Sequence, residues 1–138
     1  MSWKDKMKEF GGGNVAFLSE DGETIKFMVV AEPVLYEGEY KNKPSEKIGC
    51  PIVTADGLTI LIAGKRLARK LAKHEAKFND TVFMAIRHGG EGDSNASYEL
   101  QVLDDVDLAL KLIEIAGKEA TPEAIAAAIE EARDVVEK

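Results

Sequence analysis

Two groups of aromatic and basic residues in this chain have the chemistry to bind a nucleic-acid strand. The first comprises Tyr36, Tyr40, Lys41, Lys43 and Lys47, and the second comprises Arg87, His88 and Tyr98. Bases stack on aromatic faces while Lys and Arg follow the phosphates, so this mixture suits binding that tolerates any base sequence. The alternative is that the tyrosines pack internally and the lysines are ordinary solvated charges. Tyr98 is two and four residues from Leu100 and Val102, so in a strand all three side chains point to the same side of the sheet, and packing is favoured for Tyr98.

A third group of cations lies on residues 64–78, which have the periodicity of an amphipathic helix. Leu67, Leu71, His74 and Phe78 recur at spacings of four, three and four, so they share one face. The other faces are crowded by Lys65, Arg66, Arg69, Lys70, Lys73 and Lys77. We take Lys65, Arg66 and Arg69 as candidate phosphate contacts. A solvated face that pairs with acidic residues elsewhere explains the same charges equally well.

A predicted order of strands positions these residues. Period-two alternation and turn residues predict strands over 14–19, 24–31, 34–40, 48–54, 58–63, 81–87 and 98–103. Asp21-Gly22 and Asp56-Gly57 are hairpin signals, and the polar segment 37–47 is expected to be a loop. A helix between the third and fourth strands of a small antiparallel sheet is the connectivity of an OB barrel. The expected fold is therefore mainly β with α: an OB-like β-barrel with a helical C-terminal appendage.

An OB barrel binds its ligand with the loop after the first strand and the loop between the fourth and fifth strands. The two aromatic and basic groups fall in or beside these loops. Lys26, on the first barrel strand, completes the candidate nucleic-acid site. A single-stranded ligand is the commonest use of this fold, so it is the ligand we expect.

The chain divides into a basic N-terminal helix or arm (1–13), the barrel (14–103) and an acidic helical extension (104–138). The net charge is −7, and residues 104–138 contribute −6 of it, with 4 Lys/Arg against 10 Asp/Glu. The barrel is thus close to neutral and can still carry a basic stripe on one face.

Two helices are predicted in the extension, over 104–116 and 122–136, with Thr121 as the N-cap of the second. Each carries an apolar stripe: Leu108, Leu112 and Ile115 on the first, and Ile125, Ile129, Ala132 and Val136 on the second. The stripes can pack on each other, on the barrel or on a second copy of the chain. Self-association, giving a homodimer, is slightly favoured.

Other classes of function find no support in the sequence. Cys50 is the only cysteine, so no disulfide can form within the chain, and it has no zinc-type spacing with His74 or His88. No catalytic constellation or phosphate-binding loop is present, so we expect neither an enzyme nor a metal or other cofactor. No apolar run reaches the ~20 residues of a membrane span and no signal peptide is evident, so a cytoplasmic location is expected.

Several short motifs resemble those of small single-stranded DNA-binding proteins of bacteriophages and related viruses. They are Asn14-Val15-Ala16-Phe17-Leu18, Glu23-Thr24-Ile25-Lys26-Phe27, Glu32-Pro33-Val34, Ile86-Arg87-His88-Gly89-Gly90-Glu91-Gly92 and Ser97-Tyr98-Glu99-Leu100. The resemblance covers roughly residues 14–103. It implies an OB barrel that coats exposed strands during replication, recombination or repair, in the cytoplasm of a host cell if the protein is virus-encoded.

The same resemblance implies an acidic C-terminus that recruits replication or recombination proteins or competes with DNA. This chain departs from that pattern, because residues 104–138 are alanine-rich and have helical periodicity where the family has a disordered tail. A docking or oligomerising pair of helices is the more natural interpretation.

Our leading hypothesis is a non-enzymatic protein that binds single-stranded DNA with little sequence preference, with RNA as an open alternative ligand. The runner-up is a protein-interaction module in which the barrel is a scaffold and the C-terminal helices carry the function.

Overall fold

The computed structural model describes residues 15–18, 20–40, 43–78, 81–90 and 95–136. Its described strands are β1 (Val15–Ala16), β2 (Thr24–Val29), β3 (Val34–Tyr40), β4 (Lys43–Thr54), β5 (Gly57–Ala63), β6 (Val82–His88) and β7 (Ser97–Leu103). The described helices are α2 (Lys65–Ala72), the short 3₁₀ helix η2 (Glu75–Lys77), α3 (Val106–Glu119) and α4 (Pro122–Val136). The predicted N-terminal helix or arm, residues 1–13, lies outside the described residues.

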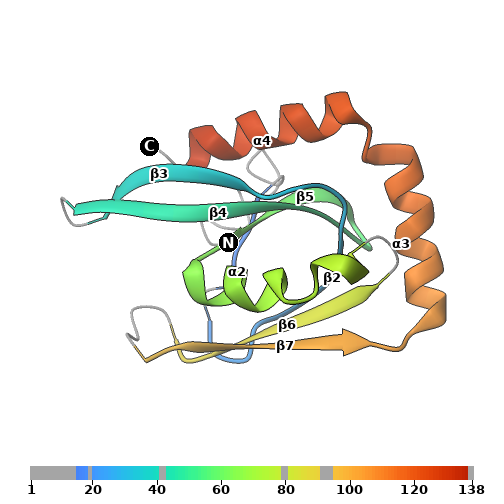
Figure 1. The fold of residues 1–138 in the computed structure, drawn as a ribbon, viewed down its shortest axis with the longest axis horizontal. Coiled ribbons are helices and arrows are strands. Elements are labelled where there is room, and N and C mark those ends of the chain that lie inside the picture. Colours follow the sequence, from blue (N-terminus) through green and yellow to red (C-terminus); the bar gives the residue numbers. More distant parts are fainter. Residues whose placement is uncertain (1–14, 19, 41–42, 79–80, 91–94, 137–138) are drawn as a thin grey trace, which may run out of the picture.

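The strands form one sheet in the order β1-β5-β4-β2-β6-β7, with β3 also paired to β4 (Figure 1). All pairs are antiparallel except β1 with β5. β2 joins the two halves, since it pairs with β6 through Thr24–Phe27 and with β4 through Met28 and Val29. The predicted mainly β fold, with a helix between β5 and β6, is confirmed. The sheet is not closed, because its end strands β1 and β7 are not paired with each other over the residues described.

β3 and β4 pair in an antiparallel ribbon that extends beyond the body of the protein (Figure 1). Its register runs from Val34 opposite Gly49 to Tyr40 opposite Lys43. The predicted loop over residues 37–47 is therefore wrong. Charged side chains such as Glu37 and Lys47 suggested a loop, but a ladder is made by backbone groups and tolerates polar side chains on a solvated ribbon.

The first predicted hairpin is also absent. The strand predicted over 14–19 shrinks to β1, which pairs in parallel with β5, Val15 lying opposite Ile60. A turn does form at Gly22, which has a φ of 80°, a value that glycine adopts without strain. This turn contacts β6 instead of reversing β1 onto β2: Gly22 N–H donates to Arg87 O at 2.7 Å, and Arg87 N–H donates to Glu23 O at 3.0 Å.

The two halves of the sheet enclose the main core, and α2 closes one side of it. Leu67 and Leu71 of α2 pack with buried Phe27 and Phe83 from β2 and β6. The ring of Phe78 meets Phe83 edge-on, with centroids 5.9 Å apart. The apolar face predicted for residues 64–78 is thus buried as expected, although the α-helix ends at Ala72 and η2 completes the segment.

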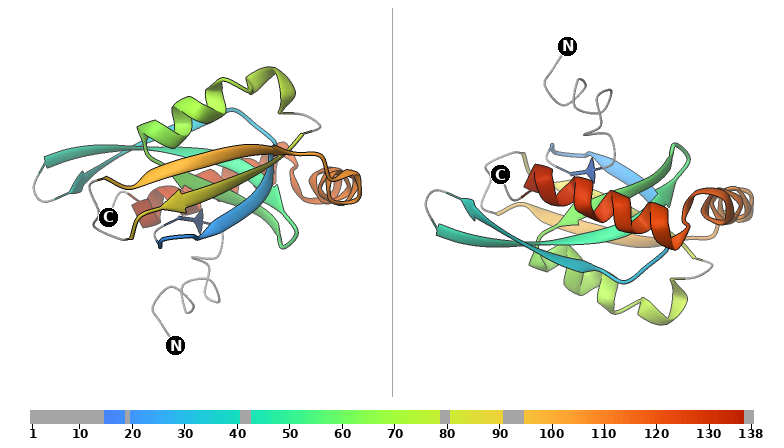
Figure 2. Two further views of the ribbon diagram at one scale, coloured as in Figure 1. Left: turned by 90° about the horizontal axis from the view of Figure 1, so that it is seen from below. Right: turned by 90° about the horizontal axis from the view of Figure 1, so that it is seen from above.

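The C-terminal helices cover the outer surface of the sheet (Figure 2). On α3, buried Leu112 packs with Met28, Val53 and Val82, and Leu108 and Ile115 join this cluster. On α4, Ala128 and Ala132 pack in a second cluster with Tyr36. Residues of both predicted apolar stripes therefore pack on the sheet, which is one of the three expected arrangements, and a homodimer stays a prediction.

The start of α4 agrees with its prediction, because Ala124 N–H donates to the Thr121 hydroxyl oxygen at 3.1 Å. At the start of α3, Leu108 N–H donates to Asp105 Oδ1 at 3.0 Å. This helix extends past residue 116, the predicted end, to Glu119. No helix among the described residues is both long and apolar enough to span a membrane.

Candidate nucleic-acid interface

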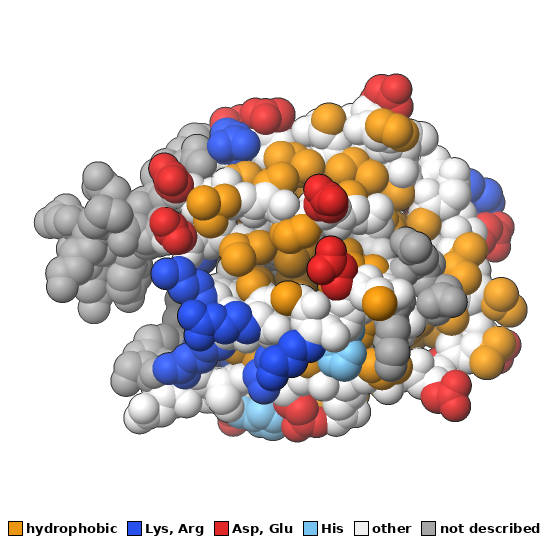
Figure 3. All heavy atoms as spheres, viewed as in Figure 1, with side chains coloured by type: hydrophobic (Ala, Val, Ile, Leu, Met, Phe, Trp, Pro, Cys, Tyr) orange, Lys and Arg blue, Asp and Glu red, His pale blue; other side chains and the backbone are white. Residues whose placement is uncertain are grey.

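The exposed side of α2 forms a basic ridge on the same face of the molecule as the β3–β4 ribbon. We define the ridge as Lys65, Arg66, Arg69, Lys70 and Lys73, all exposed, with no acidic residue between positions 65 and 73. Figure 3 shows a cluster of Lys and Arg side chains on this face. The cations predicted as phosphate contacts on this segment thus lie together, on the side opposite the buried Leu67 and Leu71.

Two contacts fix the N-terminal end of the ridge between neighbouring strands. Lys65 Nζ lies 3.9 Å from Glu46 Oε2 of the ribbon. Arg66 Nη1 donates to Ala96 O, just before β7, at 3.1 Å. The ridge therefore lies between the two regions in which the sequence predicted ligand-binding loops.

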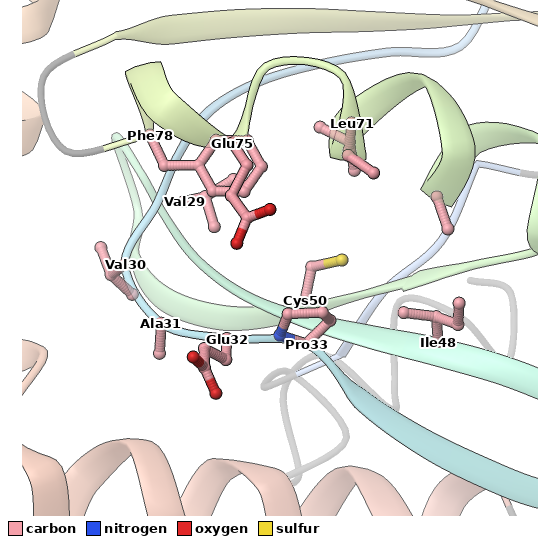
Figure 4. A pocket seen from close by; sticks show the side chains of 12 residues that line it. Val29, Val30, Ala31, Glu32, Pro33, Ile48, Cys50, Leu71, Glu75 and Phe78 are labelled. Carbon is pink, nitrogen blue, oxygen red and sulfur yellow. The ribbon is translucent and has the colours of Figure 1, made fainter.

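An apolar groove of about 380 Å³ lies beside the ridge, between α2 and the segment that joins β2 to β3. Its walls include Val29, Pro33, Ile48, Leu71 and Phe78. The sulfur of Cys50 points into the groove, and the carboxylates of Glu32 and Glu75 lie at its other side (Figure 4). The groove thus has an apolar floor, with cations of α2 beyond one end and carboxylates nearer the other.

The thiol of Cys50 is buried, at 6% exposure. Burial disfavours the thiolate and raises the pKa of Cys50 to about 11. At neutral pH this side chain is therefore an uncharged part of the groove wall, as a structural cysteine would be.

The raised pKa of Cys50 predicts a loss of stability at high pH. Its stabilising effect is complete below the pKa of an unfolded thiol, about 8.5, and is lost as the pH rises through about 11. Over this range we expect the free energy of unfolding of the wild type to fall by about 3 kcal/mol more than that of Cys50→Ala. Urea titrations at several pH values measure both slopes, and equal slopes would contradict the prediction.

Arg87 has a structural role that the sequence did not indicate. Its guanidinium donates to Gly89 O at 2.8 Å, Gly90 O at 2.9 Å and the Tyr98 hydroxyl at 2.8 Å. A longer bond, 3.4 Å, reaches Leu18 O. These bonds use most of its N–H groups, so Arg87 holds the start of the loop after β6 and has little left for a phosphate.

The two other candidates near this loop also have partners. Tyr98 is half-buried and its ring lies under the Arg87 guanidinium, 5.6 Å from the centroid, so the favoured packing role fits. His88 Nε2 lies 3.2 Å from Glu99 Oε1 on the exposed surface. Hydrogen bonds from Gln101 and His88 lower the pKa of Glu99, so this carboxylate stays charged beside His88.

Tyr36 is not available as a stacking platform. Its ring is fully buried under α4, and its hydroxyl donates to Ile129 O at 2.9 Å. Arg133 of α4 covers the ring, with the guanidinium carbon 5.5 Å from the centroid. On the strand side the ring lies over Gly49, where any Cβ would collide with it. A tyrosine enclosed on both sides cannot meet a base.

Lys47 and Lys26 are not brought to the ridge. Lys47 is opposite Tyr36 in the ribbon and shares its side, whereas neighbouring Glu46 reaches α2. Lys26 is exposed on the side of β2 opposite Phe27, which belongs to the core under α2. The side chains of Tyr40 and Lys43, and the whole of Lys41, lie outside the described part of the chain, so these three stay predictions.

Two features of the interface were missed at the level of sequence. Lys70 and Lys73 were recognised on the helix but left out of the candidate site, although they continue the ridge. The groove was missed entirely; Ile48 and Cys50 alternate on β4 and point to its side, but nothing in the sequence places them against η2.

No protein-family model, curated protein or solved structure matches this chain. The arrangement of ridge, groove and sheet therefore carries the functional argument by itself. Within the described residues there is no cluster of three or more His, Cys, Asp or Glu side chains that could hold a metal ion.

Proposed function

We propose that this protein binds single-stranded DNA with little base preference, across the face formed by the basic ridge and the apolar groove. The ridge is the observation that carries the proposal. Five exposed cations without an intervening acid make a positive strip in a chain whose net charge is −7. Such local positive potential attracts a phosphate backbone despite the negative total.

The groove supplies the second element that single-strand binding requires. Bases that leave the stack expose apolar faces, and the walls of the groove, with the ring of Phe78, offer them contacts. Glu32 and Glu75 repel phosphates at the other side of the groove, so the backbone is expected to follow the ridge while bases turn toward the groove.

The order of the strands supports the same proposal. β2, β4 and β5 are followed by α2 and then by β6 and β7, and β2 pairs with both β4 and β6. This order is compatible with a partly open OB barrel, which is the fold we propose. On this basis we propose that the protein coats exposed strands during replication, recombination or repair. Recruitment of replication or recombination proteins through the acidic C-terminus, residues 104–138, remains a prediction.

Removing two cations of the ridge should weaken binding and reduce its salt dependence. For Arg69→Ala combined with Lys73→Ala, we expect the slope of log affinity against log salt concentration to fall by roughly 1.4, or about 0.7 per phosphate contact. Fluorescence titration with oligo-dT at several salt concentrations measures this slope.

Lys26→Ala is the control, because Lys26 is also an exposed cation and lies on the side of β2 opposite Phe27 and the core under α2. Unchanged binding by Lys26→Ala with a reduced slope in the ridge variant would support the proposed face. Absence of oligo-dT binding by the wild type at low salt would exclude the proposal. The same titration with oligo-rU distinguishes a DNA ligand from an RNA ligand.

A further inference from the structure

The outer side of α3 carries apolar residues that no described part of the chain covers. Val106 is 66% exposed, Leu110 61% and Ile113 43%. Their spacings of four and three, continued by Gly117, place all four residues along one face of the helix. This outer face is distinct from the buried face that contains Leu112, and three large apolar side chains in one row mark an interaction surface.

The position of α3 leaves the outer face accessible to a large partner. The helix lies at one end of the molecule, opposite the tip of the β3–β4 ribbon (Figures 1 and 2). A shallow hollow lies next to the face, between α3 and the end of β2, lined by Val30, Ile113, Ala116, Gly117 and Ala120 among others. The space around Gly117 is open. The surface therefore combines protruding side chains with a recess of matching apolar chemistry.

A row of charges beside the outer face indicates what covers it. Along α3 the row reads Asp107, Lys111, Glu114 and Lys118, so its sign alternates at spacings of four, three and four. All four residues lie on one side of the apolar row, at the angles expected from 3.6 residues per turn. Lys118 Nζ and Glu114 Oε1 already pair at 3.0 Å within the helix.

This row is complementary to itself when it is reversed. In an antiparallel pair of identical helices related by a two-fold axis, the side that carries the charge row on one helix lies next to the same side of the other helix. Asp107 then meets the partner's Lys118, and Lys111 meets the partner's Glu114. With the charges level, Leu110 lies about 3 Å along the axis from the partner's Ile113, and Val106 lies as far from the partner's Gly117 beside the hollow, so both pairs stay within contact range. In a parallel two-fold pair the charge row of one helix would lie on the side of the contact away from the row of the other helix, so the two rows could not pair.

We infer that the outer face of α3 binds α3 of a second copy of this chain, in an antiparallel two-fold dimer. A helix of 14 residues is about 21 Å long, and two such helices side by side bury less than the roughly 1,200 Å² of a stable complex. The dimer is therefore expected to be weak, with a dissociation constant in the micromolar range. Its formation requires no nucleic acid, so it is independent of the proposed function.

Sedimentation equilibrium of the full-length protein over a range of micromolar concentrations tests the dimer. We expect the average mass of the wild type to rise from 15.0 kDa toward twice that value. Leu110→Asp should weaken dimerisation at least about tenfold, since it places two unpaired carboxylates in the apolar contact. Leu35→Asp is the matched control, because Leu35 is an exposed leucine on β3, at 51%, away from α3. A wild type that remains a monomer throughout, or dimers of Leu110→Asp as strong as those of Leu35→Asp, would overturn the inference.

Charge variants test the orientation of the two helices. Lys111→Glu places two carboxylates opposite each other and should weaken the dimer. Combining Lys111→Glu with Glu114→Lys restores opposite charges across the antiparallel contact and should recover most of the loss. Circular dichroism checks that α3 keeps its helicity after the 114–118 pair within the helix is broken. Recovery supports the antiparallel register, and a double variant weaker than both single variants would overturn it.

Discussion

Replacing Tyr36 by alanine is expected to lower the free energy of unfolding by about 3 to 5 kcal/mol. The ring is fully buried, with Gly49 on one side and Arg133 of α4 on the other. Its removal leaves a cavity between the ribbon and α4 and withdraws the hydroxyl that donates to Ile129 O. Urea denaturation followed by circular dichroism measures the change.

Tyr36→Phe separates the two contributions. It keeps the ring and loses only the bond to Ile129 O, so its expected cost is about 1 kcal/mol. Binding of oligo-dT by folded Tyr36→Phe should match the wild type, since the hydroxyl faces α4 and not the ridge. Loss of DNA affinity without loss of stability in either variant would show that α4 leaves the sheet and exposes this tyrosine to bases.

The sequence patterns predicted correctly those strands, helices and turns that depend on residues close together in the chain. The strand over 34–40 and the helix over 122–136 have the predicted bounds, and Thr121 caps the helix through its own hydroxyl. The two-residue turn before Gly57 also forms as the sequence indicated, with a φ of 119° at that glycine. In each case the residues that decide the structure are neighbours in the chain.

The failures occur where the partner is distant in the chain. The hydrogen bond from Tyr36 to Ile129 spans 93 positions, and no pattern near Tyr36 distinguishes a buried tyrosine from an exposed one. Arg87 likewise contacts Leu18, 69 positions away, and Tyr98. The pairing of β1 with β5 is equally non-local. The ridge of α2 was predictable because an amphipathic helix fixes its own exposed face.

The proposed function and the dimer use separate parts of the molecule. The ridge lies on α2, which closes one side of the core, whereas the outer face of α3 lies at the end of the molecule (Figure 1). The acidic α4 lies on a third surface, over the second cluster of buried residues. Because the ridge and the dimer contact lie on different helices, the ridge stays accessible in a dimer. Two copies joined through α3 can then bind two stretches of the same single-stranded DNA.

A chain truncated after Leu103 is expected to lose cooperative folding. α3 and α4 cover six buried apolar side chains of the sheet: Met28, Tyr36, Val53, Ile60, Ile62 and Val82. Exposure of each costs about 1.5 to 3 kcal/mol, whereas a whole domain is stable by only about 5 to 15 kcal/mol. Thermal unfolding followed by circular dichroism tests the point, and a sharp transition in the truncated chain would contradict it.

Neutralising Glu123 and Asp134 in the full-length chain removes charge from α4 without removing its packing. Both side chains are exposed. Glu123 lies in the first turn, where a carboxylate is favoured by the helix dipole, and Asp134 lies near the end, where it is disfavoured. The effects of Glu123→Gln and Asp134→Asn on stability should therefore nearly cancel, and the double variant should unfold like the wild type. If the acidity of α4 opposes DNA binding, this variant binds oligo-dT more tightly at low salt and equally at high salt, because screening removes a repulsion between exposed charges.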